Sequence, residues 1–237
     1  MPHAGAPVTL LAIETATSEV GVALGAGDVV LASATARPGR RHVETLHPLI
    51  AEVTTRAGVA LGDLAAVAVD VGPGLFTGLR VGVAAAKALA FALGRPLVAL
   101  SSTDVLLHAA RHAPGAVAVV DLRRGELAWA DAPGRLPERG GVEDLVAALS
   151  RRAGAALLVG DGALRYAQAL SAVAEIGGEE FAAPPVGALA RLAGERFATG
   201  ETVDPFALEP VYLRDADVRI NWTTRERDLR AGPGEVA

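Results

Sequence analysis

The sequence predicts an α/β protein made of two related halves, the second of them reduced. Three observations carry this prediction. Short apolar runs alternate with helical patterns along the first hundred residues, a weaker copy of the same order begins near residue 116, and turn-forming residues separate the segments. The chain has 237 residues, 51% of them hydrophobic, and no cysteine, so it can bury a large core without disulfides.

Three strands are expected first, over 8–14, 20–24 and 29–35. Each is a short apolar run, and the residues between them include Thr-Ala-Thr-Ser and Gly-Ala-Gly-Asp, which are typical of turns. Strands joined by such short turns pair in antiparallel fashion. The beginning of the chain therefore predicts a three-stranded meander.

A helix is expected over 42–57. Apolar residues recur there at three- and four-residue spacing, and the pattern stops at Gly58, a residue type that often follows helices. Pro48 lies inside the segment and is expected to kink it. The periodicity predicts an amphipathic helix.

A strand, a helix and a further strand complete the first half. The apolar run 64–71 ends at Gly-Pro-Gly (72–74), the helical pattern over 78–93 is closed by Gly94, and 96–100 is again apolar. A three-strand meander followed by helix, strand, helix and strand is the ribonuclease-H-like order, in which the later strands join the sheet in parallel.

The second half repeats part of this order. Segments 116–121 and 126–131 flank a hairpin turn, and 156–159 is a short apolar run that predicts a strand. The patterns over 142–152 and 185–199 predict helices. Two related halves suggest a duplicated fold with a cleft between them.

These patterns divide the chain into three parts. We expect a first ribonuclease-H-like subdomain over 1–103 and a second, reduced one over 104–213. The segment 214–237 is charged, contains Gly and Pro and lacks periodicity, so it is expected to be a mobile C-terminal tail.

Composition excludes several classes of protein. The net charge is -5, whereas a chain that binds nucleic acid on its own usually carries a clustered basic surface. Met1 to Pro7 carry no Lys or Arg, unlike a signal peptide. No window reaches the roughly 20 uncharged apolar residues of a membrane helix, because Lys87 interrupts the most hydrophobic segment. We expect a cytoplasmic protein without membrane contact.

The run 72–82, Gly-Pro-Gly-Leu-Phe-Thr-Gly-Leu-Arg-Val-Gly, is the most distinctive part of the sequence. Its glycines permit close approach, and Thr77 can cap the following helix, whose first amide groups attract anions such as phosphate. Alternatively, the block is a tight strand-to-helix turn whose glycines only relieve steric clashes. Gly78, Gly82 and Ala86 lie four residues apart and form a smooth stripe against which a second helix could pack.

Three turns offer polar groups to a nucleotide in the cleft. Glu14 and Thr15 open the turn after the first strand. Asp121 and Arg123 lie in the analogous turn of the second half, and Asp161 lies between two glycines. Each also has a plainer interpretation, in which the side chain only satisfies turn amides. Because a phosphate loop prefers small residues where Arg123 and its neighbour stand, the second turn is interpreted as a degenerate copy.

The histidines do not predict a metal site. His42 and His47 are five residues apart and face different sides of a helix, whereas two ligands on one helix are three or four apart. His108 and His112 have that spacing but lack an intervening glutamate and a supporting carboxylate. No Gly-x-Ser-x-Gly elbow supports a Ser-His-Asp triad. We expect no bound metal.

Several ordered motifs span positions 10 to 214. They are Leu11-Ala12-Ile13-Glu14-Thr15-Ala16-Thr17, His42-Val43-Glu44-x-Leu46, the 72–82 block, Ser101-Ser102, Asp121-x-Arg123-x-Gly125-Glu126, Trp129-Ala130 and Pro210-Val211-Tyr212-Leu213-Arg214. This set resembles the bacterial TsaB family, also called YeaZ. The resemblance implies the actin-like/Hsp70-like ATPase superfamily, with two ribonuclease-H-like subdomains.

The resemblance also implies a function. Family members help to make N6-threonylcarbamoyladenosine on tRNAs that read codons starting with A, as the obligate, non-catalytic companion of TsaD, with the ATPase TsaE as a further member. The chain is then expected to be an activating scaffold that binds and stabilises TsaD, meets tRNA through the complex and forms a homodimer when alone. ATP or ADP would bind only in complex with partners.

The family's partner contact uses the two helices of the first half, which correspond here to 42–57 and 78–93. Their apolar and small residues form the expected interface, namely Leu46, Ile50, Val53, Gly78, Gly82, Val83 and Ala86. Two alternatives stay open. One is a stand-alone nucleotide-dependent phosphotransferase of the same superfamily, which needs a catalytic carboxylate in the cleft. The other, on weaker grounds, is a metallopeptidase.

Overall fold

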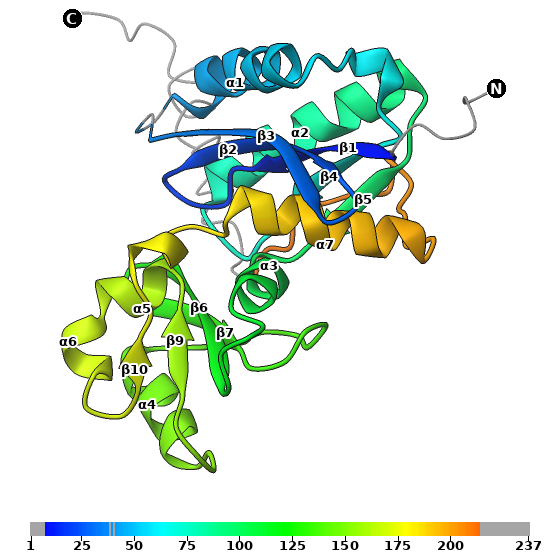
Figure 1. Cartoon of the computed structure of the whole chain (residues 1–237). Coiled ribbons are helices and arrows are strands. Elements are labelled where there is room, and N and C mark those ends of the chain that lie inside the picture. The colour runs from blue at the N-terminus through cyan, green and yellow to red at the C-terminus, as the bar shows by residue number, and fades with distance from the viewer. Residues whose placement is uncertain (1–7, 38, 40, 214–237) are drawn as a thin grey trace, which may run out of the picture.

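A computed structural model describes residues 8–37, 39 and 41–213 of the chain. Two sheets lie one above the other, each with its own helices (Figure 1). The tail predicted at 214–237 lies outside the described residues. The first sheet and its helices carry the surface groove and one of the two clusters of carboxyl groups.

The first sheet has five strands in the order β3-β2-β1-β4-β5. The first three strands pair antiparallel, whereas β4 pairs parallel with β1 and β5 pairs parallel with β4. This is the ribonuclease-H-like arrangement, as predicted. The strands are β1 (Thr9–Glu14), β2 (Val20–Ala26), β3 (Val29–Ala36), β4 (Ala66–Asp70) and β5 (Leu97–Leu100).

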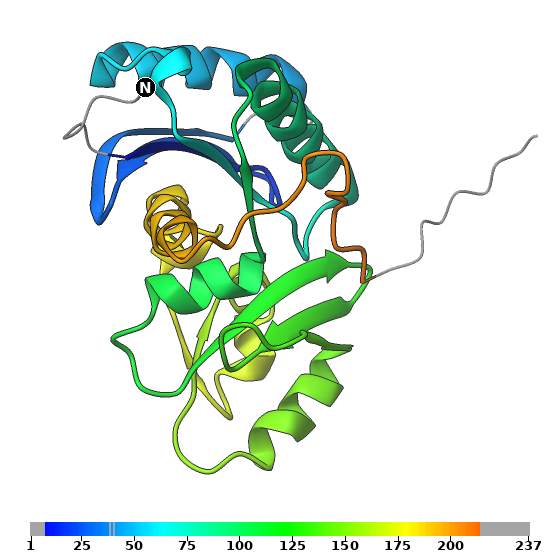
Figure 2. The same cartoon turned by 90° about the vertical axis from the view of Figure 1, so that its right-hand side faces the viewer.

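Helices cover both faces of this sheet (Figure 2). α1 (His42–Ala57) and α2 (Phe76–Leu93) lie on one face, and α7 (Val186–Ala198) lies on the other. α7 follows the second sheet in the sequence, yet it packs against β1 and β2 of the first sheet. After the second sheet, the chain thus packs against the first half again. The subdomain division at residue 103 stays a prediction.

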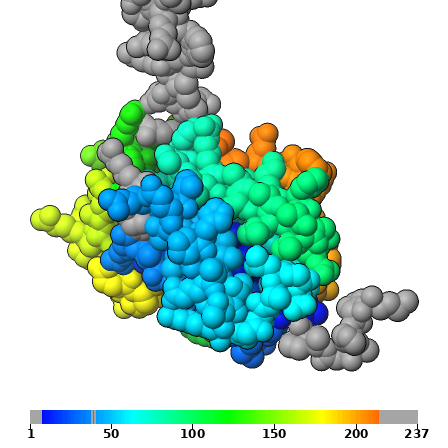
Figure 3. Space-filling model, turned by 90° about the horizontal axis from the view of Figure 1, so that it is seen from above, coloured from blue at the N-terminus to red at the C-terminus, as the bar shows by residue number. Residues whose placement is uncertain are grey.

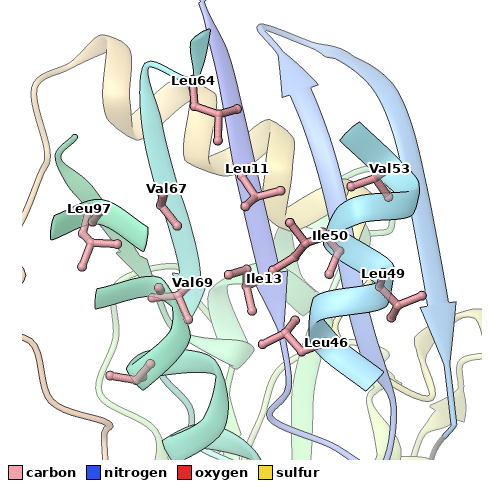
Figure 4. Packing of buried hydrophobic residues seen from close by; sticks show 14 of the residues in the cluster. Leu11, Ile13, Leu46, Leu49, Ile50, Val53, Leu64, Val67, Val69 and Leu97 are labelled. Atoms are coloured by element: carbon pink, nitrogen blue, oxygen red, sulfur yellow. The ribbon is translucent and has the colours of Figure 1, made fainter. Parts of the chain in front are cut away.

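The main core lies between the first sheet and α1 and α2 (Figure 4). Leu46 and Val53 of α1 are fully buried in one cluster with Leu11 and Ile13 of β1. Burial of a side chain of this size contributes roughly 1.5–3 kcal/mol. The helix ends at Gly58, whose φ of 63° is left-handed, so the apolar periodicity and the glycine together set both the face and the length of α1.

The second sheet repeats the connectivity of the first at smaller size. Its order, β10-β9-β6-β7-β8, matches the first sheet when β6 is set against β1, and the parallel and antiparallel pairings match as well. The second half is reduced, as predicted, because β8 has three residues and β10 only two. Its strands are β6 (Ala116–Arg123), β7 (Glu126–Ala130), β8 (Glu138–Gly140), β9 (Leu157–Val159) and β10 (Glu175–Ile176).

Short helices complete the two halves. They are α3 (Ser102–Ala109), α4 (Val142–Ser150), α5 (Asp161–Arg165), α6 (Ala167–Leu170) and the 3-10 turns η1 (Leu61–Asp63) and η2 (Glu179–Phe181). The sequence patterns missed α5 and α6, which are too short to show a helical period. α2 begins at Phe76, two residues before its predicted start, so Thr77 lies inside the helix and does not cap it. α1 continues through Pro48.

α2 is the one described helix whose length and composition would allow it to cross a membrane, with 18 residues and a mean hydropathy of 1.5. The expectation from the sequence was stricter, because it required about 20 uncharged apolar residues, and Arg80 and Lys87 interrupt this helix. One such helix is weak evidence for a span, since helices in the core of a soluble protein pass the same test. In this fold α2 packs on β4 with one side and lines a surface groove with another, and these two contacts account for its apolar composition.

Candidate functional site

A groove of about 520 Å³ opens between α1 and α2. The two helices lie side by side on the face that Figure 3 shows from above. On α1, the exposed residues Val43 and His47 line the groove. On α2, it is lined by a stripe of residues three or four positions apart, namely Thr77, Val81, Ala84 and Ala88. Open apolar surfaces of this kind are typical of sites that contact other proteins, and small side chains would let a helix approach closely.

Of the seven residues predicted to form the interface, only Leu46 lines the groove, and its side chain is fully buried. Val53 and Ala86 are fully buried and Val83 is only 4% exposed, in the cluster that packs on the first sheet. All seven residues of the predicted set are buried, and their part in an interface stays a prediction: Leu46, Ile50, Val53, Gly78, Gly82, Val83 and Ala86. The strongest apolar stripe of each helix packs on the core of the chain, whereas a second, weaker stripe lines the groove.

The segment 201–213 closes the far flank of α2, where it runs beside the helix (Figure 2). The Val203 amide donates to the Leu97 carbonyl at 2.8 Å, the Lys87 ammonium donates to the Leu208 carbonyl at 3.0 Å, and the Val211 amide donates to the Val71 carbonyl at 2.7 Å. Leu208 enters the main core. This strap, as we call 201–213, leaves the α1 side of α2 open.

An aromatic cluster ends the groove at the start of α2. The Arg80 guanidinium lies 3.9 Å from the centroid of the Phe76 ring and donates from Nε to the Tyr212 hydroxyl at 3.0 Å. The Phe76 and Tyr212 rings are 5.0 Å apart between centroids. The strap therefore contacts Phe76 and Arg80, which line one end of the groove, and cation–π and ring-stacking interactions stabilise these contacts.

The glycines of the 72–82 block have a steric role. A Cβ on Gly74 would lie 2.3 Å from the Ala16 carbonyl oxygen, and one on Gly82 would lie 2.2 Å from the Thr15 hydroxyl oxygen. The backbone of α2 thus lies directly on the turn between β1 and β2, and the Leu75 amide donates to the Ala16 carbonyl at 2.7 Å. These contacts agree with the second interpretation of the block, in which glycine relieves clashes.

Glu14 and Asp70 form a buried carboxyl pair at the carboxyl ends of β1 and β4. Glu14 Oε1 accepts from the Ala16 amide at 2.6 Å, and Asp70 Oδ1 accepts from the Gly72 amide and the Ser102 hydroxyl, each at 2.7 Å. Burial, and then the charge of Asp70, raise the pKa of Glu14 well above its ordinary value, and burial raises that of Asp70. Asp70 was not among the residues predicted from the sequence.

The other predicted cleft residues form a separate cluster in the second half. Asp121, 1% exposed, accepts from the Arg123 guanidinium at 2.8 Å and from that of Arg165 at 3.3 Å. Asp161 accepts from the Asp121 amide at 2.9 Å, and burial raises the pKa of Asp161 to about 6. Arg123 has a left-handed φ of 68°, and Asp121 also accepts from its amide at 2.8 Å.

The two clusters occupy equivalent places in the duplicated fold. Glu14 ends β1, and Asp121 lies near the end of β6, the equivalent strand of the second sheet. Likewise, Asp70 ends β4, and Asp161 follows the equivalent strand β9. Two arginines balance the charge of the second cluster, whereas the first contains two carboxyl groups and no arginine. The candidates that were predicted as one cleft site therefore lie in two clusters with different charge.

The histidines occupy structural positions. His42 is buried, with Nε2 3.1 Å from the Thr17 carbonyl oxygen, whereas His47 lines the groove. His108 Nδ1 lies 3.9 Å from a Glu195 carboxylate oxygen. Within residues 8–37, 39 and 41–213, no three His, Cys, Asp or Glu side chains are placed to hold a metal ion.

Known proteins with similar sequences indicate the family to which this fold and these clusters belong. A family model described as TsaD, tRNA N6-adenosine threonylcarbamoyltransferase, matches residues 30–150. The tRNA threonylcarbamoyladenosine biosynthesis protein TsaB of Escherichia coli is 35% identical over 125 residues, which are 52% of this chain and 54% of that protein. TsaB of Bacillus subtilis is 35% identical over 121 residues, or 51% of this chain and 53% of that protein. The chain thus matches about half the length of these relatives.

Solved structures extend the likeness over nearly the whole chain. YeaZ from Pseudomonas aeruginosa is 30% identical with a TM-score of 0.71, and the match covers 86% of this chain and 99% of that one. Component A of (R)-2-hydroxyglutaryl-CoA dehydratase from Acidaminococcus fermentans, at 11% identity, has a TM-score of 0.51 over 81% of this chain and 99% of that chain, so it shares the fold alone. The fold is that of the actin-like/Hsp70-like ATPase superfamily, as predicted.

Proposed function

The chain belongs to the TsaB/YeaZ family, and on this premise we propose that it is a non-catalytic, activating subunit of the complex that makes N6-threonylcarbamoyladenosine next to the anticodon of tRNAs that read codons starting with A. Its direct partner is TsaD, which it binds and stabilises. The chain contacts TsaE and tRNA only within the complex. ATP or ADP binds only when the partners are present, and the complex works in the cytoplasm.

The open groove between α1 and α2 carries this proposal. The TsaD family model matches residues 30–150 of this chain, a range that includes both helices, so a TsaD-type partner has an equivalent helix pair. Two such pairs can pack as a four-helix bundle, with the partner's larger side chains against Ala84 and Ala88. An apolar face that fits a homologous fold also fits itself, so the homodimer and the TsaD complex compete for one surface.

The state of the carboxylates supports a role without catalysis. Glu14 and Asp70 are buried to 1% and 0% exposure, and Asp121 is occupied by two arginines. A general base for phosphoryl transfer must reach the proton that it removes. None of these three groups is open to a substrate in this arrangement, which favours a scaffold over a stand-alone phosphotransferase.

Reconstitution with single omissions tests the proposal. Purified TsaD, TsaE, tRNA, ATP and a source of threonylcarbamoyl-adenylate are combined with and without this chain, and the modified adenosine is quantified. We expect modification to be lost when the chain is omitted, with no ATP or peptide hydrolysis by the chain alone. Full modification without the chain, or enzyme-like turnover by the isolated chain, contradicts the proposal.

A charge in the groove tests the docking face. Ala84→Glu places a carboxylate on an exposed position of the groove and is expected to weaken TsaD binding by roughly 3 kcal/mol, or about 100-fold, because the interface would bury an unpaired charge. Ala172→Glu makes the same change at an exposed alanine of the second half and serves as the control. Equal affinity of the two variants for TsaD, measured by calorimetry, excludes the groove as the contact.

A further inference from the structure

Glu14 and Asp70 are two buried carboxyl groups on neighbouring strands, an arrangement that is electrostatically unfavourable if both are ionised. The proposed docking function gives them no role. Their side chains extend from neighbouring parallel strands, since Ile13 lies opposite Val69 in the β1–β4 register and the two carboxyl residues come next. Each carboxyl group affects the pKa of the other, and both side chains are almost fully buried. Glu14 Oε2 and Asp70 Oδ2 are buried and find no N–H or O–H donor within the described part of the chain.

Among the residues that the structure describes, no positive charge is paired with Glu14 or Asp70. The ion pairs of the described residues include neither carboxyl group. The charged groups that face the pair are themselves acidic, Glu19 on the β1–β2 turn and Asp104 on α3. α1 contributes His42, which is engaged with the Thr17 carbonyl, and α7 contributes the apolar Val186. Two carboxylates in contact and out of water cannot both stay ionised.

We propose that Glu14 and Asp70 share one proton at neutral pH, and that this proton fastens the β1–β2 turn to the loop that seats α2. The proton resides on Glu14 Oε2 and is donated to Asp70 Oδ2. Asp70 is the ionised partner because its other oxygen already accepts from the Gly72 amide and the Ser102 hydroxyl, two bonds that favour its charged form.

The shared proton connects three segments of the chain. Through Glu14 it reaches the Ala16 amide in the β1–β2 turn, and through Asp70 it reaches the Gly72 amide in the loop and Ser102 at the start of α3. The same turn lies against α2 through its contacts with Gly74 and Gly82. Loss of the proton would place two negative charges between β1 and β4, directly below the beginning of α2.

The direction of the pH effect follows from the raised pKa of Glu14. Its stabilising contribution is complete below the ordinary value of 4.5 and is lost as the pH rises to the pKa in the folded chain. Over that interval the ratio of folded to unfolded chain falls by up to tenfold for each pH unit. Most buried carboxylates that are paired with cations show the opposite trend.

Amide variants test the shared proton directly. Glu14→Gln keeps an acceptor for the Ala16 amide and gives Asp70 a permanent N–H donor, so its thermal unfolding temperature at pH 8 should exceed that of wild type and vary less with pH. Asp70→Asn provides the mirror arrangement. The double variant directs two NH2 groups at each other and should be less stable than the sum of the single changes. Asp63→Asn, an exposed acid in η1, is the control.

Carbon-13 NMR of the Glu14 and Asp70 carboxyl groups in the wild-type chain reads the proton without any variant. We expect the pair to keep one proton well above pH 4.5. When that proton is lost at higher pH, the chemical shift of the Glu14 carboxyl carbon should change more than that of Asp70. Titration of both groups at or below pH 4.5 overturns the proposal. Magnesium or calcium chloride that raises the unfolding temperature of wild type at pH 8, but not of Glu14→Gln, also overturns it, because the pair then holds a cation instead of a proton.

Discussion

The Thr15 hydroxyl donates to the Gly78 carbonyl oxygen at 2.9 Å and so joins the turn after β1 to the first turn of α2. One helical turn further along, a Cβ on Gly82 would lie 2.2 Å from that same hydroxyl oxygen. The close approach therefore depends on glycine at both positions, and α2 keeps these residues despite their low helix propensity.

Gly82→Ala is expected to destabilise the chain. The new methyl group must displace Thr15, which costs about 1–3 kcal/mol in a packed core and outweighs the gain of roughly 1 kcal/mol from alanine in a helix. Gly187→Ala, in α7, is the control, because its Cβ would meet nothing closer than 3.5 Å and should be neutral or stabilising. The free energy of unfolding in urea measures both effects.

A double variant identifies the clash. Thr15→Ala removes the hydroxyl oxygen that the Gly82 methyl group would meet, so Thr15→Ala with Gly82→Ala should cost less than the sum of the single changes. Additive losses would show that the cost of Gly82→Ala arises elsewhere than in this contact.

Two adjacent residues of α2 lie on different sides of the helix, one in the core and one on the proposed docking face. Val83 is 4% exposed and Ala84 is exposed, so Val83→Glu should lower the free energy of unfolding by at least about 3 kcal/mol, whereas Ala84→Glu should change it by less than about 0.5 kcal/mol. Thermal melts followed by circular dichroism measure both. A folded Val83→Glu chain with normal stability would mean that this side of α2 does not face the sheet.

The main elements of the first half were predictable from the sequence because they are long or clearly bounded. The period over 42–57 and its closing Gly58 predict α1 with the bounds that the structure shows, and apolar runs separated by turn residues predict the meander. The reduced second half was predicted less completely, since β8, β10 and α6 are shorter than any periodic pattern.

The exposed face of α1 and α2 that lines the groove was not predictable from periodicity alone. A helix that is apolar on two sides shows which residues are apolar but not which side meets the sheet, so the buried stripe was assigned to the partner. Tertiary contacts between distant segments were also missed, such as the Tyr212 hydroxyl with Arg80. Asp70 had a usable signal, because an acid that ends a buried strand beside β1 must lie at the same sheet edge as Glu14.

Asp161 predicts a second pH dependence in the other half. Burial raises its pKa from 3.8 to about 6, so its stabilising contribution is complete below pH 3.8 and is lost as the pH rises to about 6. The shift corresponds to about 3 kcal/mol. Asp161→Asn, which can still accept from the Asp121 amide, should be more stable than wild type at pH 7 and should show a flatter stability profile between these limits. Urea unfolding at several pH values measures this, and parallel profiles for variant and wild type would contradict it.

The strap should depend on the Tyr212 ring more than on its hydroxyl. Tyr212→Ala removes both the contact with Phe76 and the bond to Arg80, whereas Tyr212→Phe keeps the ring. Loss of the ring should cost about 1 kcal/mol locally, so the Val211 amide, bonded to the Val71 carbonyl, should exchange its hydrogen about fivefold faster in Tyr212→Ala. Tyr212→Phe should stay close to wild type.

The same variants show whether the strap shapes the groove. Phe76 and Arg80 both line the groove and both contact Tyr212, so release of the strap frees the Arg80 side chain at one end of the docking face. If TsaD packs there, its affinity should fall in Tyr212→Ala in step with the faster exchange at Val211, because the partner must then restore the order that the strap had provided. Faster exchange with unchanged TsaD affinity would mean that the partner contacts the groove away from this end, against Ala84 and Ala88 alone.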